Sequence, residues 1–277
     1  MDRLRNFLLV VEKGSIAAAA DREPSRQSLL SRQIRELEAF FEVELTRRSG
    51  KTIEITEPGQ QLAGIVRRCF SELQDYQSQQ KGIKPLLRVG AGFSTMQWIL
   101  TPHTGELSQI LHSDLEMIRM RSRDAKELLR KGNVDFVVVR KNALDETDKN
   151  LVIFPIGGCG YSLFSPKTSE LPMAVPTGGG QYEMVLINAI VATHTERIRC
   201  ASLLQMSSLV AAEQASAVLP DIARSAFQRM DWVHVSKFPP LSGYRREWVV
   251  AANKRQLETR GISGRQLKLV ANLLKIS

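Results

Sequence analysis

A break at Glu23-Pro24-Ser25, between two short helical patterns, constrains the fold of this chain more than any other feature. Proline disfavours helix in the residue before it, so the alanine-rich helix that begins at Ile16 is expected to end there. Ser25 or Ser28 is expected to cap a third helix. Together with an amphipathic first helix that ends at Gly14, this pattern predicts a helix-turn-helix unit. The apolar face of the third helix is Leu29, Leu30, Ile34, Leu37 and Phe41.

A short hairpin and a long helix are expected to follow this unit. Ser49-Gly50-Lys51 is a turn pattern and residues 52–56 alternate like a strand, which predicts a wing. Thr56 is expected to cap the long helix, with Pro58 in its first turn. Apolar residues then repeat at intervals of four and three, which favours a dimer contact, although a helix lying on its own domain would show the same spacing. The seam is formed by Leu62, Val66, Cys69, Leu73 and Tyr76.

Beyond residue 85 the pattern changes to alternating strands and helices. Strands are expected near residues 86–90, 115–121 and 135–139, with helices between them, and this order favours a largely parallel sheet covered on both faces. A second set of strands and helices follows, and the strand 247–252 precedes a terminal helix. The expected α/β architecture is a winged helix-turn-helix domain at 1–57, a linker helix and hinge at 58–84, and a two-lobed domain at 85–277, with one lobe at about 85–155 and 256–277 and the other at about 156–255.

The net charge does not by itself assign this chain to nucleic acid. The formal charge is +9, but residues 1–80 contain 12 basic and 12 acidic residues, so the whole excess lies in the remainder of the chain. A DNA-binding hypothesis must therefore rest on where particular residues sit and not on the isoelectric point.

Several other classes of protein are disfavoured. The sequence lacks the run of about eighteen apolar residues that a membrane-spanning helix needs. Charged residues surround the apolar stretch near the N-terminus, which is not typical of a signal peptide, so we expect a cytoplasmic protein. The three cysteines are too scattered for a disulfide framework, and the four histidines lack the spacing of a metal motif. His103 and His112 have no convergent cysteine or aspartate motif, so we expect neither metal, cofactor nor catalysis.

Several of these segments resemble the N-terminal signature of LysR-type transcriptional regulators. The matching residues are Gly14-Ser15, Ala19-Ala20, Gln27-Ser28-Leu29-Leu30-Ser31-Arg32-Gln33-Ile34, Leu37-Glu38, Leu45 with Arg48, and Thr56-Glu57-Pro58-Gly59. The remainder is similar in length and strand order to the periplasmic-binding-protein-like regulatory domain of that family. Glu23, Glu42 and Thr46 depart from the leucine, glycine and phenylalanine that the family favours, so the chain is identified as a divergent member.

The resemblance implies a recognition helix whose polar N-terminal end enters the major groove of DNA. Gln27 and Ser28 lie at this end, and Arg32 follows Ser28 by one turn. Glutamine suits adenine edges, and arginine suits guanine or a phosphate. The alternative is that Arg32 only pairs with an acidic neighbour such as Glu36 on a solvated face. Further contacts, to the sugar–phosphate chain and from the wing to the minor groove or backbone, are expected from Arg26, Ser31, Arg47, Arg48 and Lys51.

The resemblance also implies a ligand cleft between two α/β lobes, where strand ends meet helix N-termini. Ser94 and Thr95 lie at such a strand end and offer hydroxyl and N–H groups to an anion. Arg140, directly after a buried strand, is expected to supply a counter-charge. Simple N-capping would explain each serine equally well. In the second lobe the expected ligand contacts are Met206, Ser207 and Ser208, at the start of a helix.

The sequence therefore predicts a sequence-specific DNA-binding transcription regulator, controlled by a small anionic metabolite. Its expected partners are a double-stranded DNA operator, the metabolite, RNA polymerase, and further copies of itself in a homodimer or homotetramer, with no membrane. One alternative is a DNA-binding protein whose body only oligomerises and senses no ligand. The other is an enzyme with an attached DNA-binding domain.

Overall fold

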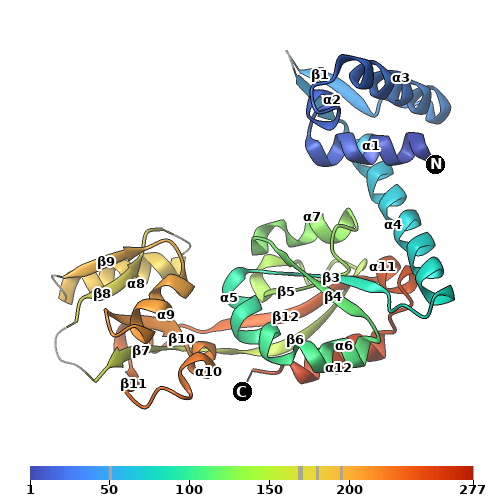
Figure 1. Cartoon of the computed structure of the whole chain (residues 1–277). Helices are drawn as coiled ribbons and strands as arrows, with labels where there is room; N and C mark the ends of the chain where they lie inside the picture. Colours follow the sequence, from blue (N-terminus) through green and yellow to red (C-terminus); the bar gives the residue numbers. More distant parts are fainter. Residues whose placement is uncertain (50–51, 168–170, 179–180, 194–195, 277) are drawn as a thin grey trace.

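The computed structural model describes residues 1–49, 52–167, 171–178, 181–193 and 196–276. Figure 1 shows a small N-terminal head, a long helix that leads away from it, and an α/β body made of two lobes. A helical head followed by two mixed sheets confirms the predicted fold class. Among the described residues, no helix combines the length and the apolar character that a membrane span requires.

The head is a helix-turn-helix unit with a two-stranded wing. Its elements are α1 (Asp2–Lys13), α2 (Ile16–Ala19), α3 (Pro24–Phe41), β1 (Thr46–Ser49) and β2 (Thr52–Ile55). Gly14 ends α1 in the left-handed conformation, at φ 74°, and the Ser15 hydroxyl accepts a hydrogen bond from the Ala18 N–H at 3.1 Å. The core below these helices includes Phe7, Val10, Ala20, Leu30, Ile34 and Leu45.

The start of α3 differs from the predicted one. The helix begins at Pro24, and neither Ser25 nor Ser28 caps it. Proline is well suited to the first helical position, because the N–H group that it lacks would have no partner there. The Ser25 hydroxyl instead donates to the Glu23 carboxylate at 2.6 Å. The helix α3 therefore begins two residues earlier than a Ser25 cap predicts, and five residues earlier than a Ser28 cap predicts.

The long helix α4 (Glu57–Gln80) begins as predicted, with the Thr56 hydroxyl accepting a hydrogen bond from the Gly59 N–H at 3.1 Å. The predicted seam divides into two parts. Leu62 and Val66 are buried in the core of the head, as expected for a helix that lies on its own domain. Further along the helix the remaining seam residues are exposed: Cys69, Leu73 and Tyr76.

The first lobe contains a five-stranded sheet in the order β4-β3-β5-β12-β6. Strand β3 runs parallel to its neighbours β4 and β5, whereas β12 runs antiparallel to β5 and β6. The helices α6 and α12 cover one face and α7 covers the other. The strands are β3 (Leu86–Ala91), β4 (Asp114–Arg119), β5 (Phe136–Arg140), β6 (Leu151–Cys159) and β12 (Arg246–Asn253). The helices are α5 (Phe93–Thr95), α6 (Thr104–Leu111), α7 (Ala125–Arg130), α11 (Lys254–Thr259) and α12 (Gly264–Leu273), with a π-helical turn at Met96–Leu100.

The second lobe contains another five-stranded sheet, in the order β11-β7-β10-β8-β9. The strands β8, β9 and β10 are parallel, and β7 runs antiparallel to β10 and β11. The strands are β7 (Tyr161–Pro166), β8 (Met173–Pro176), β9 (Arg197–Cys200), β10 (Ser216–Pro220) and β11 (Val233–Lys237). The helices are α8 (Gln181–Thr193), α9 (Leu203–Ala211) and α10 (Arg224–Phe227).

The expected division between the lobes needs two corrections. The sequence pattern places residues 247–252 in the second lobe, but β12 lies in the first sheet, between β5 and β6. The whole of β6 also belongs to the first sheet, past the expected boundary at residue 155. An apolar strand pattern indicates burial but does not identify the sheet that the strand joins, because its pairing partners are distant in sequence. The pattern also missed β6 and β11.

Candidate DNA-binding surface and ligand pockets

The N-terminal end of α3 lies on the outer side of the head. Figure 1 shows α3 at the part of the molecule farthest from the two lobes. Ser28 and Arg32 are exposed and Gln27 is half-buried. The body therefore does not cover the residues that the sequence assigned to base contacts, and this polar end is accessible to a partner.

Arg32 has only a weak partner within the head. Its Nε lies 3.6 Å from a Glu36 carboxylate oxygen, and its side chain is 71% exposed. Glu36 makes a shorter ion pair with Arg3, at 2.7 Å. Because exposed ion pairs contribute little, the Glu36 contact does not hold Arg32 against the helix surface. The alternative role for Arg32 is thus present but energetically minor.

The predicted backbone contacts lie in different surroundings. Arg26 pairs with Asp21 at 2.9 Å, and Ser31 is half-buried in a shallow pocket that Arg47 also lines. Arg47 is exposed on β1, which also contains the backbone of Arg48. The prediction for Lys51 falls outside the described residues.

Glu38 fixes the wing to α3. One of its carboxylate oxygens accepts hydrogen bonds from the N–H groups of Leu45 and Thr46, both at 2.9 Å, and from the Thr46 hydroxyl at 3.1 Å. Thr46, which stands where the LysR-type signature favours phenylalanine, therefore has a hydrogen-bond partner for its hydroxyl group. Glu42, in place of glycine, ends α3 at φ 56°, a conformation that is less favourable for a residue with a Cβ atom.

The predicted ligand residues on α5 and α9 lie close together, but their side chains mainly pack against the protein interior. The two helices contact each other, Thr95 is buried, and Met206 lies in the core of the second lobe. The actual N-cap of α9 is Ser202, so Met206, Ser207 and Ser208 do not open the helix as predicted. The hydroxyl groups of Ser207 and Ser208 both donate to the Leu204 carbonyl at 2.9 Å.

Arg140 lines a separate cavity of about 550 Å³ at the junction of the lobes. Lys141, Arg245 and Arg246 add three further cations, against two carboxylates from Glu146 and Glu247. Lys141 lies 3.3 Å from Glu146, and their hydrogen bond raises the pKa of Lys141. Arg245 donates to the Gly158 carbonyl at 2.5 Å. The Arg140 side chain has neither a hydrogen bond nor an ion pair with any described residue, so its charge is available to an anion.

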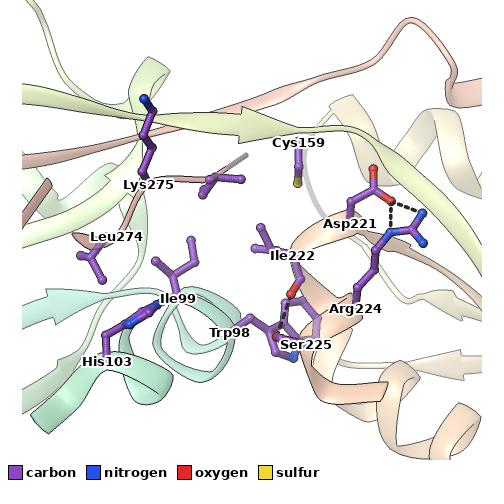
Figure 2. Close-up of a pocket in the computed structure, with 11 residues that line it drawn as sticks. Trp98, Ile99, His103, Cys159, Asp221, Ile222, Arg224, Ser225, Leu274 and Lys275 are labelled. Carbon is purple, nitrogen blue, oxygen red and sulfur yellow. Dashed lines mark hydrogen bonds and ion pairs between the residues drawn. The ribbon is translucent and has the colours of Figure 1, made fainter. Parts of the chain in front are cut away.

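A second cavity of about 520 Å³, shown in Figure 2, also has walls from both lobes. Trp98 and Ile99 form part of one wall and Ile222 part of the other, with Cys159 and the C-terminal segment 274–276 beside them. Burial raises the pKa of the Cys159 thiol, which keeps it protonated at neutral pH. The sequence did not indicate this cavity, because its walls come from four distant segments without a local motif.

No cluster of histidine, cysteine and carboxylate side chains suited to a metal ion occurs in the part of the chain that the structure describes. The chemistry that these surfaces offer is therefore hydrogen bonding and charge: an exposed polar helix end on the head, and a cationic cavity in the body.

Residues 1–60 match the family described as bacterial regulatory helix-turn-helix proteins of the lysR family. The chain is similar to the HTH-type transcriptional regulator PecT of Dickeya dadantii, with 28% identity over 145 residues, covering 51% of this chain and 46% of PecT. It is also similar to the HTH-type transcriptional activator AaeR of Escherichia coli, with 30% identity over 182 residues, covering 63% of this chain and 53% of AaeR. The matched part spans about half the length of these two relatives.

Solved structures share the overall fold across nearly the whole chain. A full-length OxyR variant from Pseudomonas aeruginosa superposes with a TM-score of 0.60 at 16% identity, covering 98% of this chain and 93% of that protein. Full-length LysG from Corynebacterium glutamicum, with its bound effector Arg, gives 0.59 at 13% identity, with coverage of 98% and 96%. CbnR in complex with its target DNA gives 0.54 at 18% identity, with coverage of 97% and 99%. At these identities the likeness supports the fold alone.

Proposed function

We propose that this chain is a sequence-specific DNA-binding transcription regulator of LysR type, from the premise that its residues 1–60 match the lysR family of bacterial regulatory helix-turn-helix proteins. One observation supports this function above all others: the N-terminal end of α3 presents Ser28 and Arg32 to solvent on the outer side of the head. A recognition helix needs this free polar end, because it must enter the major groove while its other face packs on the head.

In the proposed complex, α3 reads base edges and the wing holds the DNA backbone. Gln27, Ser28 and Arg32 face the bases, where Arg32 has the length and the two parallel N–H groups that suit guanine. Arg26, Ser31, Arg47, Arg48 and Lys51 contact phosphates or the minor groove, so they position the head without specifying sequence. These contacts predict that loss of Arg32 relaxes sequence preference, whereas loss of Arg47 weakens binding to all sequences.

A partly symmetric operator requires two heads, and α4 offers a surface for pairing them. Cys69, Leu73 and Tyr76 are exposed along the part of α4 beyond the core of the head. Leu62 and Val66 are buried within the head, so the proposed contact consists of the three exposed residues alone. We propose a homodimer through the exposed part of α4, which can pair further into a homotetramer.

The body is proposed to sense a small anionic metabolite at the cavity that Arg140 lines. Arg246 is neutralised by Glu183, and the three other cations, Arg140, Lys141 and Arg245, face two carboxylates, so the cavity keeps an excess of positive charge. The Arg140 side chain has no partner among the described residues. The cavity lies between the lobes, so a ligand there would alter their relative orientation and, through α4, the spacing of the heads. A body that only oligomerises predicts instead that no small anion stabilises the protein.

This regulator would act in the cytoplasm, where it meets the chromosome, and it would contact RNA polymerase at the genes that it activates. In this proposal the protein has no catalytic role, in keeping with its relatives, which are transcription regulators.

The test is selection of DNA sequences from a random pool by the purified full-length protein, followed by affinity measurement on the selected operator. Arg32→Ala is expected to weaken operator binding by roughly 1–3 kcal/mol and to broaden the selected sequence. The matched control is Arg121→Ala, which removes an exposed arginine from the body. If the pool yields no preferred sequence, or if Arg32→Ala and Arg121→Ala bind equally well, the proposed function is wrong.

A further inference from the structure

The head, α4 and the first lobe meet around a cavity of about 370 Å³ that is distinct from the two cavities between the lobes. Glu12 comes from α1 in the head, Arg67 and Ser71 come from α4, and Arg88 and Asn133 come from the first lobe. Apolar side chains complete the wall: Leu8, Phe70, Ile118 and Leu128. All three parts of the molecule therefore contribute polar groups to one cavity.

Arg67 is a buried cation with an incomplete set of partners. Its side chain is only 10% exposed, and its Nε lies 3.8 Å from the Glu12 carboxylate, which is long for an ion pair. Its Nη1 is buried without a hydrogen-bond partner among the described residues. Burial, together with the charge of Arg88, lowers the pKa of Arg67. An unpaired buried donor on a charged group is costly, so this site lacks an acceptor.

A second arginine faces the same cavity. Arg88 is also weakly paired, with its Nε 3.5 Å from a Glu116 carboxylate oxygen. The two carboxylates that lie near the arginines, Glu12 and Glu116, are about half exposed and so are well solvated. Two guanidinium groups that repel each other across a cavity, with only weak internal pairing, favour an oxyanion between them.

A buried hydrogen-bond acceptor without a donor narrows the chemical identity of this oxyanion. The Asn133 Oδ1 is buried and accepts no hydrogen bond from the described residues. Both side chains line the cavity, and a small rotation of each would bring its buried atom to the cavity wall. A ligand that then satisfies both atoms must accept from Arg67 and donate to Asn133. At neutral pH hydrogen phosphate has both acceptor oxygens and a hydroxyl group, and a phosphate monoester, with a second pKa of about 6, can bind as its monoanion with the same groups. Sulfate and carboxylates at neutral pH have acceptors alone.

We propose that this junction cavity binds a phosphate group, held by Arg67 and Arg88 and hydrogen-bonded to Asn133. The bound group would neutralise the repulsion between the two arginines and would join α4 to the first lobe beside α1. It would thereby stabilise one orientation of the head relative to the body. This site does not depend on the proposed DNA-binding function, since the cavity and its charges exist whatever the head binds.

The experiment is equilibrium dialysis of the full-length protein against radiolabelled inorganic phosphate, in chloride buffer at constant ionic strength and pH 7. We expect saturable binding of one phosphate per chain. Arg88→Gln and Asn133→Asp are expected to weaken it at least tenfold, the first by removing a cation and the second by adding a negative charge of the same shape. Arg67→Met is expected to abolish binding. The matched control is Arg121→Gln, an exposed arginine of the body, which should leave phosphate binding unchanged.

Competition separates the kinds of oxyanion. Sulfate is expected to displace labelled phosphate at least tenfold less effectively than unlabelled phosphate, because it cannot donate to Asn133. Displacement by glycerol 3-phosphate would identify a phosphorylated metabolite as the ligand, and failure to displace would identify inorganic phosphate; both results support the proposal. Absence of saturable binding, unchanged binding in Arg88→Gln and Asn133→Asp, or equal competition by sulfate would each overturn it. Since Arg88 and Asn133 are only partly buried, these variants keep the test decisive even if Arg67→Met does not fold.

Discussion

Glu183 on α8 and Arg246 at the start of β12 form an ion pair of 2.8 Å that joins the second lobe to a strand of the first. Their side chains are only 15% and 10% exposed, and the Arg246 guanidinium also lies 5.4 Å from the centre of the Tyr161 ring. Removing one charge from a pair this well buried is costly, because the other charge stays buried without its partner.

Glu183→Gln is expected to destabilise the protein by about 3 kcal/mol, because it leaves Arg246 as a nearly buried charge without its carboxylate. The measurement is the free energy of unfolding by urea. The control is Glu106→Gln, which changes an exposed glutamate on α6 and is expected to stay within about 0.5 kcal/mol of the parent. Equal effects of the two substitutions would show that the ion pair contributes nothing to the fold.

Gly59→Ala is expected to destabilise the head, although alanine normally favours a helix. A Cβ atom at Gly59 would lie 2.2 Å from the Leu45 carbonyl oxygen and 2.8 Å from Ile55 Cγ2, so α4 could not keep its close approach to the wing. Overpacking of this kind costs about 1–3 kcal/mol.

Gly105→Ala on α6 is the matched control for Gly59→Ala. No atom lies within 4 Å of a Cβ at this position, so the substitution is expected to stabilise the protein by about 0.5–1 kcal/mol. The measurement is the melting temperature of the two variants, each compared with the parent protein. A rise in melting temperature for Gly59→Ala would contradict the close approach.

The sequence was most informative where the determinants of structure are local. Gly14 and Ser15 predicted the end of one helix and the start of the next, and Thr56 predicted the start of α4, because caps depend on residues within one turn. The same pattern misjudged the cap of α3, since it undervalued Pro24 at the first helical position. The candidate DNA-binding residues followed from this local order together with the resemblance to the LysR-type signature.

Non-local features were beyond the reach of the pattern. The strand β12 joins the first sheet after the whole second lobe has intervened, and nothing within residues 246–253 identifies β5 and β6 as its neighbours. The seam of α4 was correct in its periodicity, but only the fold distinguishes Leu62, buried in the head, from Leu73, which is exposed. For the cavities, the sequence indicated one lining residue, Arg140, but not the other segments that complete the walls.

The buried thiol of Cys159 predicts a loss of stability at alkaline pH. Burial raises the pKa of this thiol in the folded state above its value in the unfolded chain, so folding is favoured below the unfolded pKa and disfavoured as the pH rises through it. Between an unfolded pKa of about 8.5 and the higher pKa of the folded state, one such group lowers the free energy of unfolding by up to about 1.4 kcal/mol per pH unit.

Unfolding in urea at pH values of about 8 to 10, a range that brackets the pKa of a free thiol, tests the Cys159 prediction. Cys159→Ala is expected to start less stable, because it leaves a small cavity, but to lose stability less steeply with pH than the parent. Cys69→Ala, which changes an exposed thiol, is expected to keep the parental slope. Identical slopes for all three proteins would rule out Cys159 as a contributor.

Leu73→Glu is expected to weaken self-association at least tenfold. Leu73 is 51% exposed and Tyr76 64% exposed, so in the proposed dimer both bury apolar surface against the second copy of α4. Burying a leucine side chain contributes about 1.5–3 kcal/mol, and a glutamate at this position would lose that contribution and place like charges opposite each other. Sedimentation equilibrium measures the dissociation constant.

Leu62→Ala separates association from folding on the same helix. Leu62 is only 9% exposed and packs in the core of the head, so its truncation is expected to cost about 2–5 kcal/mol of unfolding free energy. Leu73→Glu is expected to leave the unfolding of the dilute monomer nearly unchanged, because the side chain is already in water there. If Leu73→Glu instead unfolds the monomer and leaves its association intact, the exposed part of α4 packs within the chain, and the dimer must form through another surface.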